Sequence, residues 1–309
     1  MKTVRSTGCL ALIICLCISL TYSQEKQEKF PVLTGPYLGQ KPPGLTAEIF
    51  APELIGSPLG IAVSPDAHEI YYAMWGGEPQ ARIMYVKYEN GRWTAPQTAS
   101  FSGEFMDWDV NFSPDGSRLY FSSRRPLPGS DTPKEDADTW FVERTAAGWG
   151  TPQNPGLPVN TEKEEVHPTV AANGNLYFFC NIDDGSGNNI YLSRYINGSY
   201  AKPEKLGMAI NTGHHEMDPF IAPDESYLIF HSERPNGIGT YDLYISFRKE
   251  NKAWSPAINM GEHVNAERNN LCGRVSHDGK YLFFRSTRNG VRGAYWIDAA
   301  IIETLKKDL

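Results

Sequence analysis

The stretch that decides the fold is SPDGSRLYFSSRR, at residues 113–125. It joins a proline-aspartate-glycine turn to an apolar run of leucine, tyrosine and phenylalanine. Proline presets the backbone φ of the first turn position, aspartate caps the turn through its side chain, and glycine accepts a positive φ. Aromatic residues beside the turn favour a pleated, half-buried surface. The stretch therefore predicts a β-hairpin, with one strand before the turn and one after it.

The same phrase recurs along the chain about every fifty residues. Counted from Asp66, the Asp or Asn of the turn returns after 49, 58, 51 and 54 residues. The five turns read SPDA, SPDG, AANG, APDE and SHDG, at residues 64–67, 113–116, 171–174, 222–225 and 276–279. The flanking apolar segments alternate or run for four to six residues, which excludes a helical repeat. A period of this length is typical of the blades of a β-propeller.

Each unit continues with a third strand that carries an aromatic residue and a fourth strand near an aromatic–proline pair. The third-strand aromatics are Tyr85, Trp140, Tyr191, Tyr244 and Tyr295. The last unit has only three strands before the chain ends, and residues 46–52 have the pattern of the missing fourth. We therefore expect an all-β fold, a five-bladed β-propeller of four-stranded antiparallel blades, with the ring closed by an N-terminal strand.

These phrases resemble the WD40-like repeats of the PD40 type found in the propeller of the TolB family. The resemblance covers residues 46–298, and its most specific copies are residues 113–125 and APDESYLIFHSER at 222–234. The third copy departs from the pattern at Ala172 and is one residue short. The resemblance implies a propeller but leaves the function open, because similar propellers serve as protein-docking platforms, as gates on peptidases and as glycan-active enzymes.

The N-terminus has the pattern of an export signal. Lys2 and Arg5 precede an apolar run at residues 10–20, and Thr21 and Ser23 supply the small residues of a cleavage site. The run is too short for a membrane span, which needs about 20 residues. We therefore expect cleavage after Ser23 and an extracytoplasmic protein, periplasmic or secreted, with no membrane span after cleavage.

The predicted organisation has three parts: a signal peptide at 1–23, an extended lead-in at 24–45 and a single β-propeller domain at 46–309. Two cysteines, Cys180 and Cys272, follow the signal segment. They fall in different blades, so we expect two separate buried thiols rather than a disulfide.

The charge balance limits the partners. The 309 residues include 29 Lys and Arg and 36 Asp and Glu, for a net charge of -7, and they contain no basic run. This argues against nucleic acid or anionic lipid as the main partner. The sequence also contains no nucleophile elbow, phosphate loop or dinucleotide fingerprint. We expect a monomer whose partner is an envelope protein or an extracellular glycan.

Candidate site residues emerge when the five copies are aligned on their turns. Four residues before each turn stand Gly60, Asp109, His167, Asp218 and Cys272, which we call the first set. Six residues before each turn stand Pro58, Asp107, Glu165, Glu216 and Asn270, which we call the second set. Both sets are expected on one face of the first strand, because side chains alternate along a strand. That strand lines the channel of a propeller, so the two sets should meet at one channel mouth.

The second strands end near three arginines that should lie at the same mouth, Arg125, Arg234 and Arg288. One hypothesis is a metal-assisted glycan-active enzyme, a polysaccharide lyase or a glycoside hydrolase. Asp109, His167 and Asp218 would then hold a divalent metal ion, the one cofactor that these residues suggest. The acids of the second set would exchange protons, and the arginines would hold a substrate carboxylate.

The competing interpretation assigns these residues to the fold. Each acid would pair with the arginine of its own blade and fix the hairpin, and such pairs would recur because the repeat recurs. The protein would then be a binding module for a protein or glycan at the channel rim, which is our first hypothesis. The sequence assigns a catalytic role to no residue.

Overall fold

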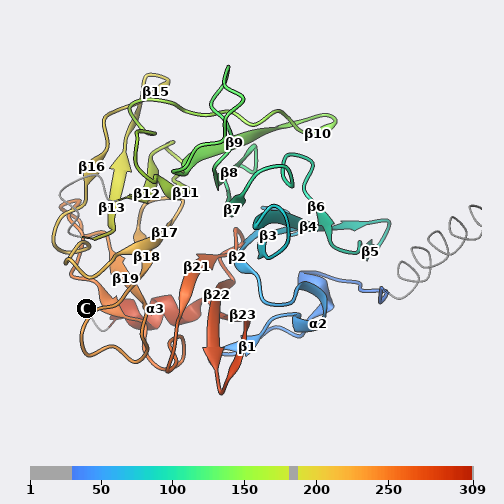
Figure 1. Cartoon of the computed structure of the whole chain (residues 1–309). Coiled ribbons are helices and arrows are strands. Elements are labelled where there is room, and N and C mark those ends of the chain that lie inside the picture. The colour runs from blue at the N-terminus through green and yellow to red at the C-terminus, as the bar shows by residue number, and fades with distance from the viewer. Residues whose placement is uncertain (1–29, 181–186, 308–309) are drawn as a thin grey trace, which may run out of the picture.

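The computed structural model describes residues 30–180 and 187–307. The expected signal peptide at 1–23 and the start of the lead-in lie outside the described residues. Figure 1 shows five sheets that follow one another around a common centre, with the first strand of each sheet innermost. Each first strand contacts the first strands of both neighbouring blades, so the ring is closed.

The blades are built as follows. Blade 1 contains β2 (Leu59–Val63), β3 (Glu69–Trp75) and β4 (Ala81–Glu89). Two short strands that both pair with β4 take the place of its fourth strand, β5 (Arg92–Trp93) and β6 (Gln97–Thr98). Blade 2 contains β7 (Asp107–Phe112), β8 (Arg118–Ser123), β9 (Asp138–Thr145) and β10 (Gly148–Trp149). Blade 3 contains β11 (Val166–Val170), β12 (Leu176–Cys180), β13 (Asn189–Ser193) and β16 (Glu204–Lys205), with the ribbon β14 (Tyr195–Ile196) and β15 (Ser199–Tyr200) beside it.

The last two blades complete the ring. Blade 4 contains β17 (Met217–Ile221), β18 (Tyr227–Ser232), β19 (Asp242–Phe247) and β20 (Ile258–Asn259). Blade 5 contains β21 (Leu271–Val275), β22 (Tyr281–Arg288), β23 (Val291–Asp298) and β1 (Glu48–Ile49). The pairing of β1 with β23 is antiparallel, so the chain's first strand is the outer strand of its last blade. The prediction of five four-stranded antiparallel blades closed by an N-terminal strand is confirmed.

The described part of the lead-in packs over the seam between blades 5 and 1. Tyr37, in the short 3-10 helix η1 (Tyr37–Gly39), is buried and its ring lies 4.9 Å from that of Tyr281. Trp93 of blade 1 donates hydrogen bonds to the carbonyls of Leu33 and Gly35, at 3.0 and 2.8 Å. These contacts tie the segment before β1 to both sides of the closure.

Two further helices flank the blades. The one-turn helix α2 (Pro52–Ile55) follows β1, and α3 (Ala300–Lys307) follows β23. Ile301 and Ile302 of α3 join the apolar core between blades 4 and 5. In the described part of the chain, no helix combines the length and apolarity that crossing a membrane requires.

Every first strand is interrupted by a β-bulge at the same place. The pairing with the second strand shifts register in all five blades, for example between Trp108 and Asn111. The first-set residue lies in the shifted segment with a positive φ in each case: Gly60 64°, Asp109 58°, His167 55°, Asp218 51° and Cys272 56°. A bulge re-aims the side chain that it carries, and a non-glycine residue there is strained by about 1–3 kcal/mol. Strict alternation therefore fails along these strands.

Candidate functional site

The bulges bring first-set side chains from three blades into contact at the centre of the ring. His167 Nε2 lies 2.5 Å from Asp109 Oδ2, and His167 Nδ1 lies 2.7 Å from Asp218 Oδ1. His167 and Asp218 are each 6% exposed, and Asp109 is fully buried. The imidazole is thus clamped between carboxylates of the two neighbouring blades.

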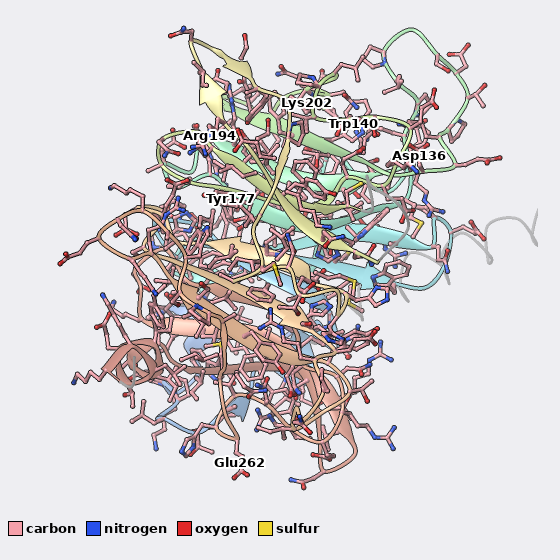
Figure 2. The ribbon with its side chains drawn as sticks, turned by 90° about the vertical axis from the view of Figure 1, so that its left-hand side faces the viewer. Asp136, Trp140, Tyr177, Arg194, Lys202 and Glu262 are labelled. Carbon is pink, nitrogen blue, oxygen red and sulfur yellow. The ribbon has the colours of Figure 1, made fainter. Side chains whose placement is uncertain are left out.

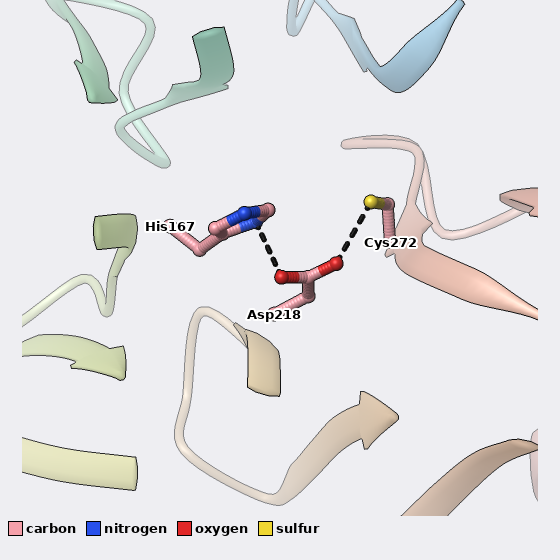
Figure 3. Close-up of side chains that lie close together, drawn as sticks. All are labelled: His167, Asp218 and Cys272. Atoms are coloured by element: carbon pink, nitrogen blue, oxygen red, sulfur yellow. Dashed lines mark hydrogen bonds and ion pairs between the residues drawn. The ribbon is translucent and has the colours of Figure 1, made fainter. Parts of the chain in front are cut away.

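Asp218 is the hub of this cluster. Its second oxygen, Oδ2, lies 3.1 Å from Nδ1 of His231 and accepts a hydrogen bond from Cys272 Sγ at 2.9 Å. Figure 3 shows Asp218 between His167 and Cys272, each reaching in from a different blade. We call these five residues the channel cluster: Asp109, His167, Asp218, His231 and Cys272. It joins blades 2, 3, 4 and 5.

The charges in the cluster depend on one another. Burial lowers the pKa of His167, but the charges of Asp109 and Asp218 outweigh it and raise that pKa to about 9. Burial raises the pKa of Asp218, yet the two imidazoles hold it well below its usual value. Burial and the nearby carboxylates raise the pKa of the Cys272 thiol. At neutral pH the cluster therefore contains an imidazolium, an ionised Asp218 and an uncharged thiol.

Arg274 fills the place that Gly60 leaves in the ring. A Cβ built on Gly60 would lie 3.5 Å from Nε of Arg274. The guanidinium is buried, and its three nitrogens have no hydrogen-bond partner among the described residues. Burial raises the pKa of Asp109 despite the positive charges of His167 and Arg274 nearby. The fifth blade thus supplies a cation where the first blade supplies no side chain.

The stability of variants at residue 60 is expected to depend on the sign of the charge that the new side chain carries. Gly60→Asp would face the unpartnered guanidinium of Arg274, whereas Gly60→Lys would add a second buried cation beside it. Both variants meet the same backbone strain, because φ is 64° at this position. We expect the aspartate variant to be more stable than the lysine variant by at least about 2 kcal/mol in urea unfolding. Equal stabilities would contradict the placement of Arg274.

The acids of the second set do not join the channel cluster, because their side chains pair with groups of their own blades. Each is fully buried and bound to the loop that precedes its own strand. Asp107 accepts a hydrogen bond from Ser102 Oγ at 2.8 Å, Glu165 from Thr161 Oγ1 at 2.5 Å, and Glu216 from Thr212 Oγ1 at 2.5 Å. The physical reason is the bulge, which turns the first set inward and leaves the second set facing its own blade.

Two of the three arginines pair with these acids inside their own blades. Arg125 Nη2 lies 2.6 Å from Asp107 Oδ1, and Arg234 Nη2 lies 3.5 Å from Glu216 Oε1. Arg288 instead donates to the carbonyl of Val264. All three guanidiniums stack on aromatic rings of the second and third strands, Arg125 at 4.9 Å from the Phe121 centroid. The structure thus contains the intra-blade ion pairs of the second interpretation.

The two mouths of the channel differ. At the mouth where the first strands begin, Leu59, Trp108 and Val166 of three blades pack in one apolar cluster. On blade 5, where β21 begins, a hollow of about 370 Å³ has Arg268, Arg285 and Arg292 among its lining residues, and we call it the rim hollow. At the opposite mouth, a smaller hollow of about 80 Å³ is mostly apolar and is lined by Phe112, Phe220 and His277.

The candidate site residues selected from the sequence leave out three groups of residues that the structure places in or near the site. His231 stands in the second strand where the second blade has Ser122. This difference between the repeats is the signal that could have identified it. Arg274 stands two positions after Cys272, the first-set residue of blade 5, so the alignment did not select it. The arginines of the rim hollow lie outside the two aligned positions of the first strand, so the alignment of repeats did not select them. Cys180 and Cys272 are both buried free thiols, as expected.

Comparison with known proteins supports the fold and leaves the function open. No protein-family model matches the chain, so the PD40 type itself is not found. No curated protein matches its sequence. Among solved structures, TolB from Acinetobacter baumannii is similar, with 15% identity and a TM-score of 0.51 over 79% of this chain and 52% of that one. A protein assigned as TolB from Agrobacterium tumefaciens has 15% identity and a TM-score of 0.50 over 76% and 72%.

An enzyme has a similar fold as well. The alpha-L-arabinofuranosidase from Lactobacillus brevis has 13% identity and a TM-score of 0.50 over 77% of this chain and 89% of that one. At these identities the likeness concerns the fold alone. The choice between a binding module and an enzyme therefore depends on the geometry of the site.

Proposed function

We propose that the chain is an extracytoplasmic binding module that engages its ligand, as a monomer, at the channel mouth where the first strands begin. The observation that carries this proposal is the state of the channel cluster. Both ring nitrogens of His167 face carboxylate oxygens, at 2.5 and 2.7 Å, and the group is buried. These charges neutralise one another and connect blades, which is the task of a structural ion-pair network.

An enzyme working in the channel would need a free base within reach of a substrate. A general base must contact the proton that it removes, directly or through one water molecule. The imidazolium of His167 has no lone pair to offer, and the residue is 6% exposed with both ring nitrogens facing carboxylates. The rim hollow, in contrast, presents polar side chains to solvent. Geometry thus favours binding at the rim over chemistry in the channel.

One observation favours the enzyme alternative. His167, Asp218 and Cys272 each place a ligand atom within 4.8 Å of the others, so this buried group could hold a metal. A thiolate, an imidazole and a carboxylate together suit zinc. Binding would require both a deprotonated thiol and a neutral imidazole, and the surroundings of Cys272 and His167 oppose both. A divalent ion would therefore have to displace a proton from each of these two side chains.

Addition of zinc distinguishes the binding module from the metal-assisted enzyme. We expect ZnCl₂ in modest molar excess to change the melting temperature by less than about 1 °C, because only a ligand of the native state stabilises it. The matched control is Cys272→Ser, which keeps the donor to Asp218 and removes the soft ligand. A saturable rise in melting temperature that this substitution abolishes would support the metal-assisted enzyme instead.

The direct test measures binding and turnover on one set of ligands. The full chain would be titrated calorimetrically with neutral and acidic oligosaccharides and with envelope proteins of the exporting cell, and the saccharides would be checked for new reducing or unsaturated ends. We expect saturable binding to at least one of them and no new ends. Turnover that disappears in His167→Gln, with the circular dichroism spectrum unchanged, would overturn the proposal.

A further inference from the structure

The rim hollow on blade 5 is lined mainly by polar side chains that have no partner elsewhere in the described residues. Its polar lining consists of Arg268, Arg285, Arg292, Thr240, Asn269 and Thr287. Within residues 30–180 and 187–307, none of these six side chains makes a hydrogen bond or an ion pair. No acidic residue lines the hollow. The nearest acid in the sequence is Glu267, whose carboxylate accepts a hydrogen bond from the backbone N–H of Asn289 at 3.0 Å.

The strands of blade 5 fix the arrangement of these groups. Arg285 and Thr287 are two residues apart on β22, so their side chains point to the same face. Arg292 on β23 is the cross-strand partner of Thr287, and Leu271 on β21 is the partner of Arg285. Two guanidiniums and one hydroxyl thus project from one face of a paired sheet, with Leu271 beside Arg285.

The remaining lining residues come from loops that are tied together. Arg268 and Asn269 precede β21, and Thr240 precedes β19. A parallel bridge between Tyr241 and Asn269 holds the two loops side by side. The Asn270 side chain donates to the carbonyl of Tyr241 at 3.1 Å and to that of Arg268 at 3.0 Å. The hollow is therefore formed in advance of any ligand, which lowers the entropic cost of binding.

We propose that this hollow binds the carboxylate groups of an acidic saccharide, an inference that rests on the proposed function and names its ligand class. Planar guanidiniums bind carboxylates through two parallel hydrogen bonds, and three of them lie here on a chain whose net charge is -7. The amide and the two hydroxyls can pair with sugar hydroxyls. The volume of about 370 Å³ falls in the usual range for a small-molecule site.

A second feature of the same mouth suits a sugar ring. Trp75 ends β3, whose residue Ala73 pairs with Leu59 at the start of β2. Its side chain is 44% exposed, and its ring centroid lies 6.2 Å from that of the buried Trp108. An exposed indole held by a second indole is a stacking surface for a saccharide. An acidic peptide such as polyglutamate would supply carboxylates but no sugar ring for this indole to stack on.

The experiment titrates the full chain with the trisaccharide of galacturonate and with the same trisaccharide as its methyl ester. The ester removes the charges and leaves the sugar. We expect the acid form to bind, the ester to bind at least about tenfold more weakly, and the affinity of the acid to fall as salt rises. Arg285→Gln and Arg292→Gln should each weaken binding of the acid by about tenfold.

The control is Arg194→Gln, which makes the same charge change on blade 3, at an arginine labelled in Figure 2. It should leave the affinity unchanged. Equal binding of acid and ester, unchanged binding in both blade 5 variants, or tighter binding of a polyglutamate peptide would overturn the inference.

The two proposals fail in different ways. Binding of a neutral saccharide or a protein at this mouth, without binding of the acid, would overturn the ligand class and leave the binding module intact. Cleavage of the bound acid would overturn the binding module and leave the ligand class intact.

Discussion

Asp218→Asn is expected to lower the free energy of unfolding by about 3–5 kcal/mol. The carboxylate faces His167 at 2.7 Å and His231 at 3.1 Å and accepts the Cys272 thiol at 2.9 Å. An amide cannot neutralise the imidazolium, and removal of one partner from a buried ion pair costs about this much. Urea unfolding followed by tryptophan fluorescence measures the change.

The matched control is Asp131→Asn, the same substitution on an exposed loop. A surface change of this kind is expected to stay within about 0.5 kcal/mol of the parent. If Asp218→Asn also stays within about 1 kcal/mol, the channel cluster does not hold the blades together.

Stability is expected to decrease as the pH rises from 6.5 to about 9. His167 has an ordinary pKa of 6.5 when unfolded and about 9 in the folded protein. A raised pKa stabilises the fold fully below the unfolded value, and the gain is lost as the pH passes the folded value. A difference of this size corresponds to a loss on the order of 3 kcal/mol across the window. Urea unfolding at a series of pH values measures it.

Asp218 acts with the opposite sign at the acid end. Its pKa is lowered on folding, so its contribution is complete above the usual aspartate value and disappears as the pH falls through the folded value. The cluster is therefore most stabilising in mildly acidic solution. In His167→Gln the decrease between pH 6.5 and 9 should disappear. A decrease of the same size in that variant would assign the effect to another group.

The fold could be predicted from the sequence because its chemistry is local and repeated. Each turn carries its own proline, Asp or Asn and glycine preferences, and the pattern occurs five times, so single weak signals reinforce one another. The closure of the ring by an N-terminal strand could be predicted because the last repeat lacks a fourth strand of its own. The helix α3 was not predicted, because it occurs once and follows the last repeat.

The site could be predicted only in part, for a reason that lies in the backbone. Alignment on the turns selected Asp109, His167 and Asp218, and the structure brings these three together. It also placed Asp107 on the same face, because strict alternation ignores a bulge. His231, which belongs to the channel cluster, and Arg274, which lies beside Gly60, stand outside the aligned position and depend on how neighbouring blades meet.

The strain in the first strands is consistent with this arrangement. Asp109, His167, Asp218 and Cys272 all adopt a positive φ, which non-glycine residues avoid. Such strain persists where surrounding contacts outweigh it. The ion pairs and hydrogen bonds of the channel cluster supply those contacts, so the bulges and the cluster stabilise one another.

The most direct test of the central claim is the pair of ¹⁵N chemical shifts of the His167 ring at about pH 7.5. The claim is that this imidazole is a cation clamped between Asp109 and Asp218, and therefore neither a base nor a metal ligand. We expect both nitrogens to carry a proton at that pH and to titrate together near 9. One unprotonated nitrogen at that pH would contradict it.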